Sequence, residues 1–404
     1  MKSKSVYGLV PRFLPAIILS LACGACSGNG GWTGSVAERN GTEILMNPAT
    51  PLMDGAEATA TELWSFQGAA WMNPSLVHVQ GEVVTVVDPP ANQIHRVSTE
   101  GEEEESLGRP GGGPGEFLRL RDALPDGDRF AVLDAGKSGI QYVDQEGRYV
   151  SSVYLEGQPW GGFFLGDGTL LVKGEFLSDP GEETRGDWVT LTEGRDPQAF
   201  TAVPLDPLPE EEGVQCSELS SWGDGAARMR YTTPQIQLFD SAGNLRTEIQ
   251  IGIPIEAVSE TERSEALAGL EKSLVDRGLP PPFVQQNLVV MQERWRVKCR
   301  FGPLRFDSSA RLAAFMEENP DEFGGGNATL HLLTGDGVYL AKIAFPDPWR
   351  DFTMDNGIVY ALTRDSVTDV ITLRAYRVDL PESVLSQASR VLEEARQHMT
   401  TLDH

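Results

Sequence analysis

The side chains that most often carry out chemistry are few in this sequence and widely separated. The histidines lack the spacing of metal ligands on one element: they are His78, His95, His331, His398 and His404. The stretch Asp134–Gly139, DAGKSG, contains Gly-Lys-Ser, but Ala131 stands where a phosphate-binding P-loop needs a glycine. Ile140 replaces the last glycine of a nucleophile elbow. The sequence therefore predicts no catalytic residue and no metal site, and DAGKSG is interpreted as a hairpin turn.

A second stretch that could take part in binding or chemistry is GRPGGGPGEF, from Gly108 to Phe117. Glycine-rich loops can cradle phosphate, but no Gly-Lys-Ser/Thr follows, and the acidic run Glu102–Glu105 stands beside it. Glycines that accept positive φ, combined with prolines that fix φ, favour a rigid corner. We expect Arg109 and Glu116 to pair across this corner and Phe117 to be buried. The alternative is a loop that contacts a ligand.

The N-terminus has the pattern of an export signal. A basic region precedes the short apolar run Phe13–Ala22, FLPAIILSLA, and Cys23 follows directly. Such a run is too short for a transmembrane helix and is typical of a secretory signal. We expect residues 1–22 to be a lipoprotein signal peptide and Cys23 to carry the lipid. The alternative is an ordinary cleaved signal, with Cys23 and Cys26 as bystanders. By resemblance to known lipoproteins, Gly24 indicates the outer membrane of a Gram-negative bacterium.

Two further cysteines, Cys216 and Cys299, lie in the body of the chain. In an exported protein such a pair is a candidate disulfide. The alternative is two separately buried thiols.

The charge balance excludes one class of partner. The chain has 33 Lys and Arg against 59 Asp and Glu, a net charge of −26. Such a surface repels phosphate backbones, so nucleic-acid binding is excluded. Anionic membranes repel it as well, so we expect attachment to the membrane through the N-terminal lipid.

The elements that must position any site repeat along the chain. One series of turn glycines, spaced 46, 47 and 49 residues apart with a last step of 94, is Gly101, Gly147, Gly194, Gly243 and Gly337. A second series precedes strand-like segments at Gly81, Gly127, Gly168, Gly225 and Gly357, and a degenerate sixth copy surrounds Ser309. A period in the forties with three or four short strands predicts an all-β, six-bladed β-propeller. A large β-sandwich is the competing fold, but sandwiches lack such a period.

Other segments complete this plan. Thr61–Gly68 could complete the last blade and close the ring. Ser259–Glu262 is a capping-box pattern that predicts a helix up to Gly278, and a second helix is expected from Phe283 to about residue 296. An apolar stripe near the C-terminus predicts a helix that packs on the flank of the propeller.

The predicted organisation has four parts. Residues 1–22 form the signal peptide and 23–61 a flexible tether. Residues 62–380 form the propeller, with a helical insertion at about 253–300 after blade four, and 381–404 the C-terminal helix.

With the blades placed, the glycine-rich stretch joins blades one and two. It resembles the signature Gly-Arg-x-Gly-x-Gly-Pro-Gly-Glu-Phe of bacterial six-bladed, NHL-like propeller proteins, many of which are exported lipoproteins. The matching positions are Gly108, Arg109, Gly111, Gly113, Pro114, Gly115, Glu116 and Phe117. This family has no generally established activity, so the resemblance implies fold and localisation.

Two classes of function follow. The favoured one is a binding or scaffolding module that uses one mouth of the ring for a protein, peptide or glycan partner, without a cofactor. The alternative is a lactonase- or esterase-like hydrolase, which by resemblance would hold calcium in the central channel with Glu, Asn and Asp side chains. The candidate amides Asn73, Asn92, Asn244 and Asn356 are equally well explained by turns.

Overall fold

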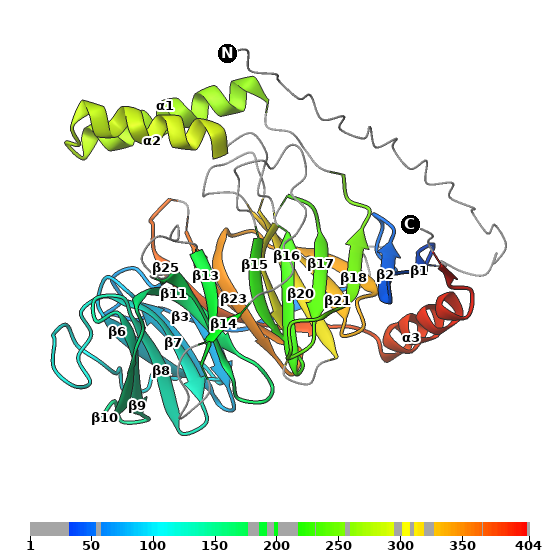
Figure 1. Cartoon of the computed structure of the whole chain (residues 1–404), viewed down its shortest axis with the longest axis horizontal. Coiled ribbons are helices and arrows are strands. Elements are labelled where there is room, and N and C mark those ends of the chain that lie inside the picture. Colours follow the sequence, from blue (N-terminus) through cyan, green and yellow to red (C-terminus); the bar gives the residue numbers. More distant parts are fainter. Residues whose placement is uncertain are drawn as a thin grey trace, which may run out of the picture. The chain divides into compact units, whose positions relative to one another are not determined.

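The computed structural model describes residues 32–53, 58–176, 186–191, 198–200, 217–230, 232–254, 259–294, 301–307, 311–318, 327–365 and 367–401. Six sheets form the blades of a β-propeller, as predicted (Figure 1). The innermost strands contact one another in chain order, and the last of them, β23, contacts the first, β4, so the ring is closed.

The blades follow one another along the chain. Blade one contains β4 (Leu76–Gln80), β5 (Val83–Asp88) and β6 (Gln93–Ser98). Blade two contains β7 (Leu120–Asp126), β8 (Arg129–Asp134), β9 (Gly139–Asp144) and β10 (Tyr149–Tyr154). Blade three contains β11 (Gly157–Phe164), β12 (Leu170–Phe176), β13 (Gly186–Leu191) and β14 (Gln198–Phe200).

The second half repeats the plan. Blade four contains β15 (Ser217–Trp222), β16 (Gly225–Arg230), β17 (Gln235–Phe239) and β18 (Leu245–Ile251). Blade five contains β19 (Phe301–Phe306), β20 (Leu312–Glu318), β21 (Ala328–Thr334) and β22 (Tyr339–Ala344). Blade six contains β23 (Trp349–Asp355), β24 (Ile358–Arg364) and β25 (Ile371–Asp379).

The ring is closed by the N-terminal strand β3 (Thr59–Phe66). It pairs antiparallel with β25 as the outermost strand of blade six, from Phe66 opposite Leu373 to Thr59 opposite Asp379. The expectation that this segment completes the last blade is confirmed.

The turn glycines that define the repeat adopt positive φ in the described blades, with one shift. In blade four the positive φ belongs to Gly223, at 52°, whereas Gly225 is the first residue of β16. The turn therefore lies two residues earlier than the sequence indicated.

The expectation of a flexible tether over residues 23–61 is wrong for its central part. Strands β1 (Ser35–Arg39) and β2 (Thr42–Asn47) form a hairpin, and β2 pairs in parallel with β18, so the sheet of blade four continues outward. Leu45 of this hairpin is fully buried. The physical reason is that β2 carries the apolar run Ile44–Met46, of which Ile44 and Leu45 are buried, and pairs with the edge strand β18.

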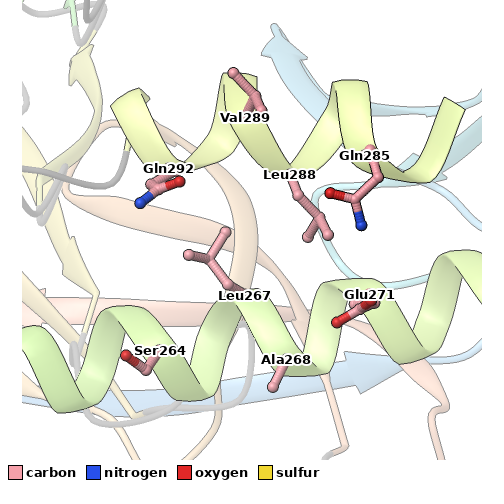
Figure 2. A pocket seen from close by; sticks show the side chains of 8 residues that line it. All are labelled: Ser264, Leu267, Ala268, Glu271, Gln285, Leu288, Val289 and Gln292. Carbon is pink, nitrogen blue, oxygen red and sulfur yellow. The ribbon is translucent and has the colours of Figure 1, made fainter. Parts of the chain in front are cut away.

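The helical insertion lies where the sequence placed it. Helix α1 (Glu260–Asp276) begins at a capping box between Ser259 and Glu262, and α2 (Pro281–Arg294) packs against it. A groove of about 380 Å³ between them is formed by these two helices alone (Figure 2).

The C-terminal helix α3 (Glu382–Gln397) buries Val384, Ala388 and Leu392 in the core of the blades and lies against β1. It is followed by the short strand β26 (Thr400–Thr401), which pairs in parallel with β1. Among the described residues, no helix is long and apolar enough to cross a membrane.

Candidate functional site

The innermost strands of four blades carry a β-bulge. The pairing register shifts at Leu120/Asp122 in β7, Pro159/Gly161 in β11, Phe301/Leu304 in β19 and Trp349/Asp351 in β23. A bulge re-aims the side chains around it, and bulges are frequent next to functional sites. In β7 and β23 the residue after the shift is an aspartate, so two carboxylates occupy equivalent positions in blades two and six.

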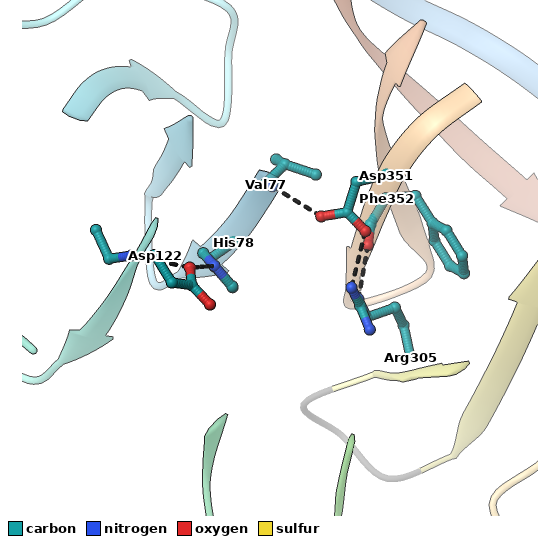
Figure 3. Close-up of polar contacts among 7 residues, drawn as sticks. Val77, His78, Asp122, Arg305, Asp351 and Phe352 are labelled. Carbon is teal, nitrogen blue, oxygen red and sulfur yellow. Dashed lines mark hydrogen bonds and ion pairs between the residues drawn. The ribbon is translucent and has the colours of Figure 1, made fainter. Parts of the chain in front are cut away.

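Both carboxylates reach the innermost strand of blade one. Asp351 Oδ2 accepts a hydrogen bond from the backbone N–H of Val77 at 2.9 Å. On the other side of β4, the Nε2 atom of His78 lies 2.7 Å from Asp122 Oδ1, which also accepts the backbone N–H of Ala123 (Figure 3). Blade one is therefore held from both neighbouring blades by equivalent side chains.

Arg305 of blade five continues the chain of contacts. Its Nη2 donates to Asp351 Oδ1 at 2.8 Å and its Nε donates to the carbonyl of Phe352 at 2.9 Å. Figure 3 shows the two pairs, His78–Asp122 and Arg305–Asp351, on either side of β4. We call His78, Asp122, Arg305 and Asp351 the polar belt. It links blades five, six, one and two at their innermost strands.

Burial governs the electrostatics of the belt. Burial raises the pKa of Asp351, while the Arg305 charge and the N–H of Val77 act in the opposite direction. The guanidinium donates directly to the carboxylate, so the belt holds a buried, hydrogen-bonded ion pair of the kind that tolerates burial. The two pairs are alike in exposure, because the His78 and Arg305 side chains are each 21 % exposed and both aspartates are buried.

The belt does not fit the calcium site of the hydrolase alternative. Calcium takes six to eight oxygen ligands. Here the two carboxylates are each engaged by a cationic or imidazole partner, and among the described residues no group of three His, Cys, Asp or Glu side chains could hold a metal ion.

The four candidate asparagines lie in loops and turns outside the strands that carry the belt. Asn92, Asn244 and Asn356 occupy the turns between β5 and β6, β17 and β18, and β23 and β24, and Asn92 Oδ1 accepts the N–H of Leu120. Asn73 precedes β4, and its Oδ1 accepts from Arg350 at 2.5 Å.

One end of the channel carries exposed apolar side chains. In blades one and two the chain enters the innermost strand through equivalent loops. Met72 N donates to Asp88 Oδ2 at 2.6 Å, and Leu118 N donates to Asp134 Oδ2 at 2.9 Å. Met72 is 67 % exposed and Leu118 is 51 % exposed.

Blade three adds Trp160, the extra residue of the β11 bulge, which is 41 % exposed. The innermost strands of a ring of repeats run in the same direction, and the three residues lie before β4, before β7 and in the first half of β11. We call Met72, Leu118 and Trp160 the apolar rim.

The glycine-rich stretch is a corner between blades one and two. Phe117 is 1 % exposed and packs among residues of both blades, including Ile94 and Leu120. The Nε of Arg109 donates to Glu116 Oε1 at 2.9 Å, so the expected pair forms. The backbone N–H of Gly113 donates to Glu116 Oε2, and this bond together with Arg109 lowers the pKa of Glu116.

The glycines of the corner are not equivalent. Positive φ occurs at Gly108, at 84°, and at Gly115, at 74°, but not at Gly113. A Cβ on Gly108 would lie 2.2 Å from the ring of Phe117. At Gly113 the turn is held instead by the Glu116 carboxylate, which accepts the Gly113 N–H.

The stretch DAGKSG is the hairpin turn between β8 and β9, as predicted. Its Lys137 Nζ donates to the carbonyls of Gly113 at 2.7 Å and Glu116 at 2.8 Å. Lys137 therefore bonds two carbonyls of the glycine-rich corner between blades one and two. Cys23, Cys26, Cys216 and Cys299 lie outside the described residues.

Sequence reasoning missed Asp122, Arg305 and Asp351. A signal for the two aspartates was present: the triplets Leu120-Arg121-Asp122 and Trp349-Arg350-Asp351 open the innermost strands of two blades with the same apolar–Arg–Asp pattern. Arg305 has no such counterpart in the repeat.

The comparisons with known proteins place the fold. A Bacteroides fragilis protein described as "Putative exported protein" matches with a TM-score of 0.53 and 11% identity, over 83% of this chain and 100% of that one. A member of the DUF4221 family from Bacteroides vulgatus matches with a TM-score of 0.52 and 8% identity, over 81% and 99%. No family model and no curated protein matches the sequence. At these identities the likeness supports the propeller fold alone.

Proposed function

We propose that the protein is an exported, lipid-anchored propeller of the outer membrane that binds a protein, peptide or glycan partner at the apolar rim. The observation that carries this proposal is the equivalence of Met72 and Leu118. Each is exposed, and each is fixed through its backbone N–H by a buried aspartate at the end of a second strand. Exposed apolar side chains on a rigid backbone are typical anchors of a binding surface.

The polar belt gives the rim its rigidity. Asp122 and Asp351 join blade one to both neighbours directly behind the loops that carry the rim. A pre-ordered surface loses less entropy on binding than a mobile one. In the belt, Asp122 and Asp351 are both engaged by protein partners, so neither is offered to calcium as an open ligand.

Export and lipidation rest on the N-terminal sequence and on the signature of NHL-like propeller lipoproteins. The description of the Bacteroides fragilis neighbour as exported is consistent with this proposal. We expect mass spectrometry of the mature N-terminus to find diacylglycerol on Cys23, and Cys23→Ser to release the protein from membranes. A mature chain that begins elsewhere without lipid would contradict the anchor but leave the rim proposal standing.

Site-specific photo-crosslinking in cells tests the rim. A photoreactive amino acid at Leu118 or Trp160 should give a discrete adduct. The matched control is Asp128, an exposed residue in the turn at the other end of β7. Equal adducts at Asp128, or none at the rim, would refute the rim as the binding surface.

A further inference from the structure

The interface between blades three and four contains two positive charges. Leu171 of β12 and Ala226 of β16 pack together in its apolar part. Residues two apart on a strand point to the same face, and over these residues β12 pairs regularly with β13 and β16 with β17. Lys173 and Arg228 therefore point into the same interface, one from each blade.

The second strands of the other blades are uncharged in their middle part. The segments concerned, in β5, β8, β20 and β24, are Val84–Val87, Phe130–Leu133, Ala313–Met316 and Val359–Leu362. A charge in such a place weakens the fold, because it loses water on burial and is repelled by a like charge facing it. Departures of this kind from a repeat are expected at functional sites.

Neither cation is neutralised within the described part of the chain. Lys173 and Arg228 form no ion pair or hydrogen bond there, and the Arg228 guanidinium lies 5.6 Å from the centroid of the Phe239 ring. Arg230, which is 4 % exposed, lies on the same face of β16. Burial and the Arg230 charge lower the pKa of Arg228, but a guanidinium keeps its proton at neutral pH. The interface therefore attracts an anion.

Gln237 is a second, independent indication of a ligand. It lies opposite Arg228 in the pairing of β16 with β17, so both side chains share one face. It is 7 % exposed, and its Oε1 has no hydrogen-bond partner among the described residues. Buried polar groups without a partner are uncommon in folded proteins. The amide carries two N–H donors, which can bond to an oxygen held by Arg228.

We propose that this interface binds a small oxyanion, a carboxylate or phosphate group, between Lys173 and Arg228. The guanidinium offers a planar pair of donors that matches two oxygens of such a group, and Lys173 adds a point charge from the other blade. Both side chains are partly exposed, so a solute can reach them. A bound oxyanion would join blades three and four, and it should therefore stabilise the folded chain.

Thermal unfolding of the full chain tests the site. The probes are sodium acetate and sodium phosphate, each titrated at constant ionic strength set with sodium chloride. A ligand that binds only the folded state should raise Tm, by about 4 °C at a concentration of about 100 Kd. Arg228→Met and Lys173→Met should each weaken the response at least tenfold in probe concentration. The control Lys342→Met removes one exposed positive charge from blade five and should keep the wild-type response.

The variants in chloride alone separate binding from a structural role. Arg228→Met should then be at least as stable as the wild type, because it removes a charge that has no acidic partner among the described residues. A saturating response to acetate alone would identify a carboxylate site, and one to phosphate alone a phosphate site. The absence of a saturating response to both salts would overturn the proposal, as would an undiminished response of Arg228→Met or its destabilisation in chloride.

Discussion

Substitution of Gly108 is the sharpest test of the corner between blades one and two. Its φ of 84° is unfavourable for any residue with a Cβ, at a cost of about 1 to 2 kcal/mol. The added Cβ would also lie 2.2 Å from the Phe117 ring, which is buried and cannot turn away into solvent. Overpacking of this kind costs about 1 to 3 kcal/mol. Gly108→Ala should therefore lower the free energy of unfolding by about 2 to 5 kcal/mol.

The matched control is Gly127→Ala. Gly127 has a φ of 64°, and nothing lies within 4 Å of a Cβ built there, so it isolates the backbone cost of about 1 to 2 kcal/mol. For a chain of this length, 1 kcal/mol corresponds to about 1.5 °C in Tm, measurable by differential scanning fluorimetry or calorimetry.

A double-mutant cycle with Phe117→Leu completes the test. The smaller side chain removes ring atoms near the new methyl group, so the double variant should be less destabilised than the sum of the single changes. The packing argument is refuted if Gly108→Ala lowers the free energy of unfolding no more than Gly127→Ala does. It is also refuted if the effects of Gly108→Ala and Phe117→Leu are additive.

Three further predictions concern other parts of the molecule. Asp351→Ala should lower the free energy of unfolding by about 3 kcal/mol in denaturant titration, because it removes the Arg305 ion pair and the acceptor for Val77; an effect below about 1 kcal/mol would contradict it. Leu45→Ala should lower the free energy of unfolding by about 2 to 5 kcal/mol, whereas the same truncation in a flexible tether would leave it almost unchanged. The Asn244 N–H, together with Arg246, lowers the pKa of Asp240 from 3.8 to about 2. The ionised Asp240 carboxylate therefore stabilises the fold above about pH 4, and this stabilisation is lost as the pH falls toward 2. Tm measured against pH should show wild type and Asp240→Ala converging over that window.

The repeat made most of the fold predictable. Turn glycines at regular spacing mark the hairpins of the blades, and the capping box at Ser259 marks α1, because both are local signals that the chain must satisfy whatever it packs against. The ring-closing role of β3 also followed, since a propeller needs its last blade completed.

The hairpin β1–β2 was missed although its signal is present. Asn40-Gly41, a pair typical of two-residue hairpin turns, separates two short segments, and both residues have positive φ. Its place beside β18 could not be predicted, because the pairing joins residues about 200 positions apart that share no motif.

The polar belt was harder still to predict. Asp351 becomes a neighbour of β4 only when the ring closes, and the directions of both Asp122 and Asp351 depend on the bulges that precede them. Sequence periodicity describes strands of regular pleat, so it places a residue after a bulge on the wrong face.

The seven-stranded sheet of blade four contains segments from both ends of the chain, with β2 against β18 and β26 against β1. This arrangement has a mechanical consequence. A pull on the chain upstream of Trp32 acts first on β1 and on its hairpin partner β2, whose bonds to β18 run side by side along five residue pairs. Force entering at this end therefore acts on the β1–β2 and β2–β18 ladders of blade four before it can reach β3, the strand that keeps the ring closed.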